Sequence, residues 1–191
     1  MTTRTTDTKL DPVFLDRWSP RAFDRSDMPE ADLATIIDAA RFAPSASNIQ
    51  PWRFLYARRG DENWERFLAG LVASNRAWAE NASVLFYVVS QKHAGGPERP
   101  SHTHSFDAGA AWAMLAMQAT MLGYYTHAMA GVHFSEIAAE LGVPDDFRVE
   151  AAIALGRIGD PAMLSESQRA RETPSGRKTR DEIAWPGDFR S

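Results

Sequence analysis

The chain has 191 residues, of which 44% are hydrophobic and 24% charged, and its net charge is -4 at pH 7. This composition is typical of a globular protein, and we expect one domain over residues 1–191, with residues 1–10 disordered. The acidic balance argues against a nucleic-acid partner, and the absence of cysteine excludes disulfides, thiolate nucleophiles and cysteine-held metal clusters.

The N-terminal residues 1–10 contain no apolar run, so we expect no secretory signal there. No stretch of the chain approaches the roughly 20 apolar residues of a membrane span. We therefore expect a cytoplasmic protein without a membrane partner.

The rest of the chain alternates helical and extended patterns. Asp11 and Pro12 predict the N-cap and first residue of a short helix that ends near Arg17. A second helix begins at Pro29 and ends before Pro44, because the residue before a proline disfavours helical backbone. Farther along we expect strands over 52–57, 83–90, 124–130 and 149–155, and helices over 64–71, 106–122 and 135–141, the last capped by Ser135. Strands separated by helices predict a sheet of mixed strand direction covered by helices, in an α/β or α+β fold.

The helix over 106–122 is rich in alanine and methionine, and Gly123 is placed to end it. Because most of its faces are apolar, we expect it at the centre of the protein or at a dimer interface. Met114, Met117 and Met121 recur at a spacing that favours core packing.

A polar joint lies between the second helix and the first strand. It holds two prolines, two serines, an asparagine and a glutamine, whereas two residues suffice to reverse the chain. This density of donors and acceptors favours a ligand. The residues concerned are Pro44, Ser45, Ala46, Asn48 and Gln50.

Four further patterns point to a ligand, each with an ordinary structural alternative. Arg17 and Arg21 flank Ser19, and guanidinium groups bind phosphate through paired hydrogen bonds; the alternative is a solvated charge pair. Asn75 offers a donor and an acceptor, or is a plain helix-terminal residue. The other two are Met129-Ala130-Gly131, alternatively a simple strand-to-helix turn, and Arg177, alternatively part of an exposed basic run.

The five histidines suggest a metal site, but only His102 and His104 lie close together in the sequence. Metal sites usually need three or four ligands, so we expect no metal. These two histidines and Phe106 are expected to line a loop near a substrate pocket.

Together the motifs resemble those of the nitroreductase family of flavoproteins. The family carries an Arg-x-Ser-x-Arg/Lys-x-Phe box near the N-terminus and, later, a Pro-Ser-Ser/Ala-x-Asn-x-Gln-Pro-Trp box. The chain has the first as Arg17, Ser19, Arg21 and Phe23, and the second as Pro44, Ser45, Ala46, Asn48, Gln50, Pro51 and Trp52. The resemblance continues through Asn75, Gly131 and Arg177. The chain departs from common forms at Trp18, which is alternatively a core anchor, and at Ala46 and Ala130.

The resemblance implies an α+β nitroreductase-like fold, with a central mixed, mostly antiparallel sheet flanked by helices and a C-terminal tail that reaches a partner subunit. It also implies a homodimer with two noncovalent FMN sites at its interface. The phosphate, ribityl chain and pyrimidine edge would be held by Arg17, Ser19, Arg21 and Arg177, with Trp18 nearby and Asn75 at the pyrimidine edge. The region of flavin N5 would face Met129, Ala130 and Gly131. The partner subunit would supply Pro44, Ser45, Ala46 and Asn48, and Gln50 is also implied as a cofactor-binding residue.

The activity that the resemblance implies is hydride transfer from NADH or NADPH, through flavin N5, to a small acceptor such as a nitroaromatic or quinone, in two half-reactions. The cofactor carries this chemistry, so no catalytic side chain is named. Two alternatives stay open: a flavin-binding or sensing protein of the same fold without turnover, and a reductase specialised for a small aldehyde or enone.

Overall fold

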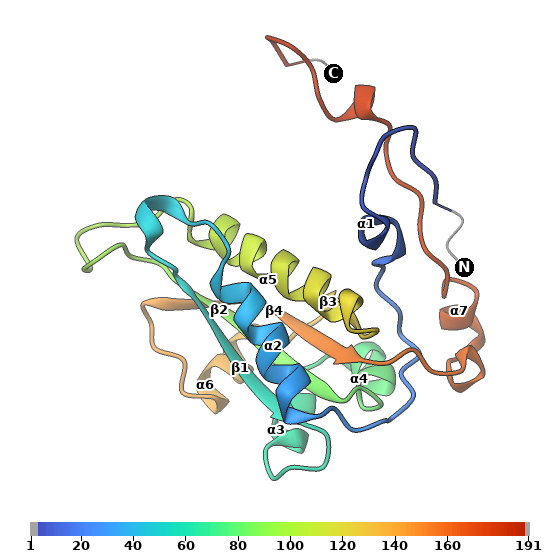
Figure 1. Ribbon diagram of the computed structural model, residues 1–191. Coiled ribbons are helices and arrows are strands. Elements are labelled where there is room, and N and C mark those ends of the chain that lie inside the picture. Colours follow the sequence, from blue (N-terminus) through green and yellow to red (C-terminus); the bar gives the residue numbers. More distant parts are fainter. Residues whose placement is uncertain (1–3, 190–191) are drawn as a thin grey trace.

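The computed structural model describes residues 4–189 and is built on a four-stranded sheet in the order β1-β2-β4-β3 (Figure 1). The strands span Trp52–Arg58 (β1), Val84–Gln91 (β2), Tyr125–Met129 (β3) and Phe147–Gly156 (β4). All four lie where the sequence predicts them, within one to two residues at most ends. The expected α+β class is confirmed.

Every pairing in the sheet is antiparallel. The β2–α5–β3 crossover does make β2 and β3 run in the same direction, as the expectation of a mixed sheet requires. However, β4 lies between these two strands and pairs with both. The expected mixed pairing is therefore corrected: strands of like direction are present, but they are not neighbours.

Helices cover both faces of the sheet. As a result, β2 and the second half of β4 are buried on both sides. One face is covered by α2 (Glu30–Arg41) and α5 (His104–Met121), which pack around Leu33, Ile36 and Leu115. The other is covered by α3 (Trp64–Ala69), α4 (Ala73–Ala79) and α6 (Phe134–Glu140), which enclose a cluster that includes Trp78.

Helix boundaries follow the predicted signals with one exception. α1 (Pro12–Asp16) is capped by Asp11, whose Oδ1 accepts the Val13 N–H at 3.0 Å. α5 is followed by Gly123 at φ 77°, a conformation that favours glycine. The predicted cap at Ser135 is wrong: the N-cap of α6 is His133, and it makes no side-chain capping bond.

α5 buries only one of its faces. Ala108, Ala111 and Leu115 are buried against the sheet and α2, whereas Met114 and Met121 are 43% and 62% exposed. The prediction that these two methionines belong to the core is wrong within one chain, because their seven-residue spacing places them together on the opposite face. We expected this helix to be buried on most of its faces, but only the face toward the sheet is buried within one chain.

After β4 the chain forms an arm that stands away from the body together with the N-terminal residues (Figure 1). The arm contains η2 (Pro161–Met163), α7 (Glu166–Arg169) and η3 (Arg180–Glu182), and η1 (Ala46–Asn48) lies within the polar joint. The two ends of the chain are linked by an ion pair of 3.0 Å from Arg180 to Asp7. Residues 4–10 are placed along the arm, whereas residues 1–3 of the expected disordered lead lie outside the described residues.

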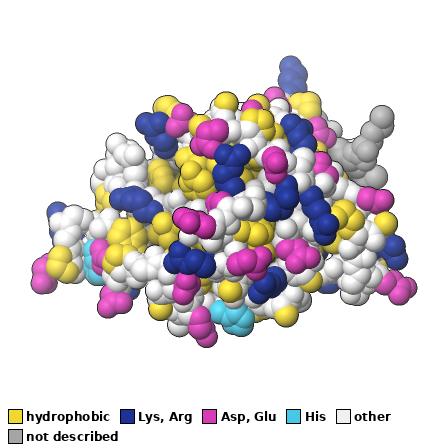
Figure 2. Space-filling view, turned by 90° about the horizontal axis from the view of Figure 1, so that it is seen from below, with side chains coloured by type: hydrophobic (Ala, Val, Ile, Leu, Met, Phe, Trp, Pro, Cys, Tyr) yellow, Lys and Arg dark blue, Asp and Glu magenta, His cyan; other side chains and the backbone are white. Residues whose placement is uncertain are grey.

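On the face seen in Figure 2, acidic and basic side chains alternate, with hydrophobic side chains between them. No helix among residues 4–189 is long and apolar enough to cross a membrane.

Candidate functional site

A pocket of about 290 Å³ lies where the arm joins the body. We call it the arginine pocket, because five guanidinium-bearing residues line it and its lining contains no Asp or Glu. Such a lining suits an anion. Its residues are Arg4, Arg17, Trp18, Ser19, Arg21, His127, Arg171, Thr173, Ser175 and Arg177.

The segment after α1 forms one wall of this pocket because two anchors hold it in an extended conformation. At its start, the Arg17 N–H closes α1 on the Val13 carbonyl at 2.9 Å. At its end, the Gly159 N–H donates to the Ala22 carbonyl at 2.9 Å. Gly159 is required there, since a Cβ would lie 2.6 Å from the backbone carbon of Phe23. The side chains between the anchors therefore face a fixed cavity.

Glu172 fixes the backbone at Arg21. Its Oε1 accepts the N–H groups of Arg21 and Ala22 at 2.6 and 2.8 Å, and its side chain is 2% exposed. The Arg21 guanidinium lies 4.0 Å from Glu172 Oε2, which has no hydrogen-bond partner among the described residues. The carboxylate thus holds the wall in place from behind and leaves the pocket itself lined by cations.

The cations of the pocket crowd one another. The Arg4 guanidinium donates to the Arg17 carbonyl at 2.6 Å and to the Ser175 carbonyl at 3.0 Å, which joins the N-terminal lead, the α1 segment and the arm. Burial lowers the pKa of Arg17, and the positive charges of Arg177 and Arg4 lower it further. An anion bound here would relieve this repulsion.

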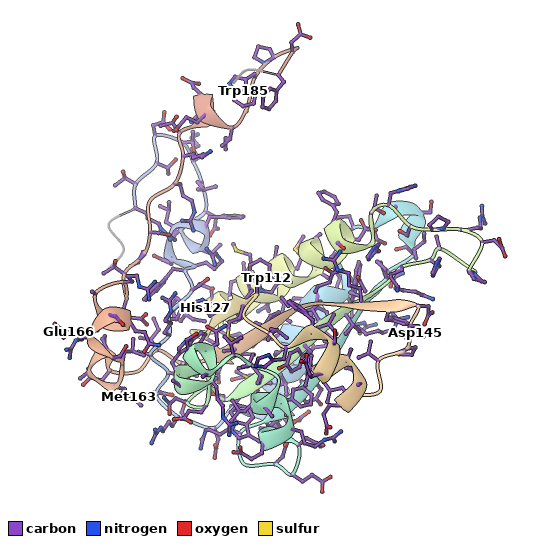
Figure 3. All side chains as sticks on the ribbon, turned by 180° about the vertical axis from the view of Figure 1, so that it is seen from behind. Trp112, His127, Asp145, Met163, Glu166 and Trp185 are labelled. Atoms are coloured by element: carbon purple, nitrogen blue, oxygen red, sulfur yellow. The ribbon has the colours of Figure 1, made fainter. Side chains whose placement is uncertain are left out.

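His127 enters the pocket from β3 (Figure 3). Its Nδ1 lies 2.9 Å from the Pro20 carbonyl, and its ring packs on Trp78 with 4.7 Å between ring centroids. Burial lowers the pKa of His127 to about 4, against the opposing effect of the Pro20 hydrogen bond, and the charge of Arg21 lowers it further. The imidazole is therefore neutral at pH 7.

The lowered pKa of His127 predicts a pH dependence of stability. The unfolded chain binds the proton near pH 6.5 and the folded chain only near pH 4, so the stabilisation is complete above pH 6.5 and is lost as pH falls through this window. The free energy of unfolding should fall by about 3 kcal/mol more in the wild type than in His127→Phe between pH 6.5 and 4. Urea denaturation at several pH values measures this, and parallel profiles for the two proteins would contradict it.

Two of the predicted site residues, Asn75 and Gly131, are hydrogen-bonded to each other. The Asn75 side-chain amide donates to the Gly131 carbonyl at 3.2 Å, and the Val72 N–H donates to the same oxygen at 3.1 Å. Met129 is buried at the end of β3, and Ala130 is exposed. None of these residues is in the lining of the arginine pocket, but Met129 lies on the same strand as His127, and Ala130 and Gly131 directly follow that strand.

Gly131→Ala should destabilise the protein by about 1–2 kcal/mol. A Cβ at this position would lie 2.5 Å from Asn75 Nδ2 and 2.8 Å from Val72 Cγ2, so the amide must leave its carbonyl partner. Gly176→Ala is the matched control, because a Cβ there meets no atom within 4 Å. Urea denaturation compares the two; equal stability of both variants would refute the close packing at Gly131.

The polar joint is tied to the start of α5. The Ala46 N–H donates to Asp107 Oδ2 at 3.2 Å, and the Gln50 N–H donates to Ser45 Oγ at 3.0 Å. Asn48 and Gln50 have φ values of 55° and 52°, which non-glycine residues adopt at a cost. A strained, exposed backbone held by a buried carboxylate is typical of a binding segment.

The two halves of the predicted site do not meet within one chain. The joint is bonded to the first turn of α5, whereas His127 lies in β3, after the far end of that helix. Asp107, to which the joint is bonded, lies 14 residues before the end of the helix at Met121, about 21 Å at 1.5 Å per residue. The structure therefore brings Arg17, Trp18, Ser19, Arg21 and Arg177 together, and leaves Pro44, Ser45, Ala46, Asn48 and Gln50 apart from them.

Sequence reasoning missed several residues of the site. Arg4, Arg171 and Glu172 lie in the lead and in the arm, where charged residues look solvated, and no local pattern distinguishes them. His127 and Asp107 gave no signal apart from being ionisable groups inside apolar elements. Trp18, for which a core anchor was the alternative, lines the pocket.

The histidines of the 91–106 region do not line the arginine pocket. His104 Nδ1 lies 2.7 Å from Ser90 Oγ, and the same hydroxyl donates to the carboxylate of Glu150. Phe106 is exposed. No group of three or more His, Cys, Asp or Glu residues in the described part of the chain is placed to hold a metal ion.

Comparisons with known proteins identify the family of the chain. The family model described as the nitroreductase family matches residues 15–157. An uncharacterised 15.4 kDa protein of Mycolicibacterium smegmatis is 36% identical over 143 residues, which are 71% of this chain and 95% of that protein. A Streptomyces coelicolor protein named provisionally as an NADH dehydrogenase/NAD(P)H nitroreductase is 37% identical over 73 residues, 38% of this chain and 36% of its own length.

Among solved structures, an oxidoreductase described as containing FMN is 49% identical to this chain. It superposes with a TM-score of 0.96 and covers 100% of this chain and 98% of its own. The matched range, residues 15–157, spans the first box, the polar joint, Asn75 and Gly131. The chain belongs to the nitroreductase family.

Proposed function

We propose that the protein binds FMN with its phosphate in the arginine pocket and acts as an NAD(P)H-dependent oxidoreductase. The observation that carries this proposal is the pocket itself: five arginines line it without an acidic residue, and burial, followed by the neighbouring guanidiniums, lowers the pKa of Arg17. An FMN phosphate carries close to two negative charges, which this donor set suits. The 49% identical structure, which contains FMN, supports the choice of ligand.

The residues of the chain fit the parts of FMN. Arg17, Arg21 and Arg177 would hold the phosphate, and the Ser19 hydroxyl would add a neutral donor. Gly131 has no Cβ where Asn75 and Val72 pack, so the Asn75 amide is held close to the backbone at the end of β3, where it would meet the pyrimidine edge of the flavin. When bound, FMN supplies reversible two-electron chemistry between NAD(P)H and a small acceptor such as a nitroaromatic or quinone. The side chains of this protein bind, orient and shield; none is assigned as a general acid or base.

The proposal includes a homodimer. The polar joint lies at the opposite end of α5 from the arginine pocket, so in one chain it has no ligand to serve. A two-fold axis near the exposed face of α5 would bring the joint of one subunit to the pocket of the other. The exposed Met114 and Met121 support this placement of the interface. The arm would then reach the partner subunit.

Anaerobic spectroscopy tests the proposed function. The purified protein should be yellow or should quench FMN fluorescence on titration, and NADH or NADPH should bleach the bound flavin. A screen of nitroaromatics, quinones, aldehydes and enones against the reduced protein would then identify the acceptor. Retained flavin that neither donor reduces would contradict turnover and leave a binding or sensing protein. No flavin binding at all would contradict the assignment of the pocket.

A further inference from the structure

The arginine pocket contains one side chain whose hydrogen-bonding role differs from all others in its lining. Guanidinium groups and the Trp18 indole only donate hydrogen bonds, and the hydroxyls of Ser19, Thr173 and Ser175 donate or accept. Among these side chains, only His127 can therefore offer the ligand an atom that accepts a hydrogen bond and cannot donate one. Its role depends on which ring nitrogen carries the proton.

The Pro20 carbonyl decides the tautomer of His127. A carbonyl oxygen only accepts, so the Nδ1 atom 2.9 Å from it must carry the hydrogen. Burial keeps the ring neutral, with a pKa of about 4. A neutral imidazole that is protonated on Nδ1 has a lone pair on Nε2, which can only accept.

Because Nδ1 is bonded to the backbone, Nε2 is the ring nitrogen that is left to face the pocket. Among residues 4–189 the ring has hydrogen bonds to the backbone of Pro20 and, with a smaller effect on its pKa, of Ser19. The 2.9 Å bond uses Nδ1, and Nε2 is not among the buried polar atoms that lack a partner, so Nε2 is accessible. His127 lines the arginine pocket, which gives this accessible atom its exit. The Trp78 contact and the Pro20 bond fix the plane of the ring, so the direction of the lone pair is fixed as well.

We propose that His127 Nε2 accepts a hydrogen bond from a hydroxyl on the chain that carries the ligand's phosphate, and that it thereby selects a polyol phosphate over a bare anion. The identity of this ligand as FMN rests on the proposed function. FMN presents three secondary hydroxyls next to its phosphate, whereas sulfate presents only acceptor oxygens and gains nothing from Nε2. His127 is then a specificity-determining residue of a site whose arginines by themselves recognise only charge.

The test is a binding titration of the flavin-free protein, in which the quenching of flavin fluorescence is the measured signal. The ligands are FMN and an FMN analogue whose phosphate-bearing chain lacks the three hydroxyls, with sulfate as a competitor. The proteins are the wild type, His127→Phe and His127→Gln, with His133→Phe as a matched control at an exposed histidine. Phenylalanine keeps the ring contact with Trp78 and removes the acceptor, whereas the glutamine oxygen restores one.

We expect His127→Phe to bind FMN about tenfold more weakly than the wild type. Its sulfate inhibition constant and its affinity for the analogue should equal those of the wild type, and His127→Gln should recover part of the loss. This pattern isolates the hydroxyl–Nε2 pair, because each partner is removed separately and then together. A purely structural role of His127 would weaken all three ligands alike.

Other outcomes separate this inference from the proposed function. Equal FMN affinity of the wild type and His127→Phe, or an equal loss for FMN and the analogue, overturns the inference and leaves the flavin site intact. A wild type that binds sulfate but no FMN overturns both. Nitrogen-15 NMR of the wild-type imidazole is independent of any variant's folding: a proton on Nε2 overturns the inference.

Discussion

FMN should be lost from the protein when Arg17 and Arg21 are both replaced by alanine. Each guanidinium is expected to contribute a charge-assisted hydrogen bond to the phosphate, worth about 1.5–3 kcal/mol. Removing both should therefore weaken FMN binding by a factor of about 100 or more. Flavin absorbance of the purified protein and fluorescence titration of the flavin-free protein measure the change.

A double variant with the same change in net charge separates this effect from general electrostatics. Arg66→Ala with Arg148→Ala removes two guanidiniums outside the arginine pocket, and it should retain FMN. Circular dichroism checks that both double variants are folded, which matters because Arg21 lies beside the buried carboxylate of Glu172. Unchanged flavin content in the Arg17/Arg21 variant would refute the phosphate role of both residues.

Met114→Glu combined with Met121→Glu should convert the protein to a monomer and remove most of its bound FMN. Both side chains are exposed in the single chain, so the substitutions should leave its own core intact. In a dimer that buries this face of α5, each carboxylate would be desolvated without a partner, at a cost of several kcal/mol. Light scattering coupled to size-exclusion chromatography reports the mass, and flavin absorbance reports the cofactor.

The control adds two glutamates elsewhere, at the exposed Ser135 and Ala139 of α6. It should remain dimeric and keep its flavin. Loss of the dimer with full retention of FMN in the methionine variant would show that one chain completes the site alone. The joint between α2 and β1 would then lose its proposed role at the partner's cofactor.

The parts of the site that sequence reasoning found are those whose chemistry is local. Arg17, Ser19 and Arg21 lie within five residues, and the capping signal of Asp11 marks the start of the short helix that ends at Asp16, directly before them. Strands were located because runs such as Val84–Val89 are apolar throughout, which is typical of a strand in a sheet covered on both faces.

What sequence reasoning missed depends on contacts between distant residues. Glu172 lies 151 residues from the Arg21 N–H that it accepts, and Arg4 lies 171 residues from Ser175. In the sequence each is one charge among many in irregular segments. The exposure of Met114 and Met121 was missed for a related reason: an apolar residue shows that it will be covered, but not whether its own chain covers it.

The two chain ends are linked by the contacts Arg180–Asp7 and Arg4–Ser175, and we expect this arrangement to make ligand binding separable from folding. The hydrophobic clusters of the body involve no residue beyond Leu164, whereas Arg171, Glu172 and Arg177 all lie after it. Trypsin has sites in this exposed stretch, at Arg169 and Arg171. A single proteolytic cut there should leave the sheet and its helices folded and release the anchor of Arg21, so we expect limited digestion to abolish ligand binding before it unfolds the protein.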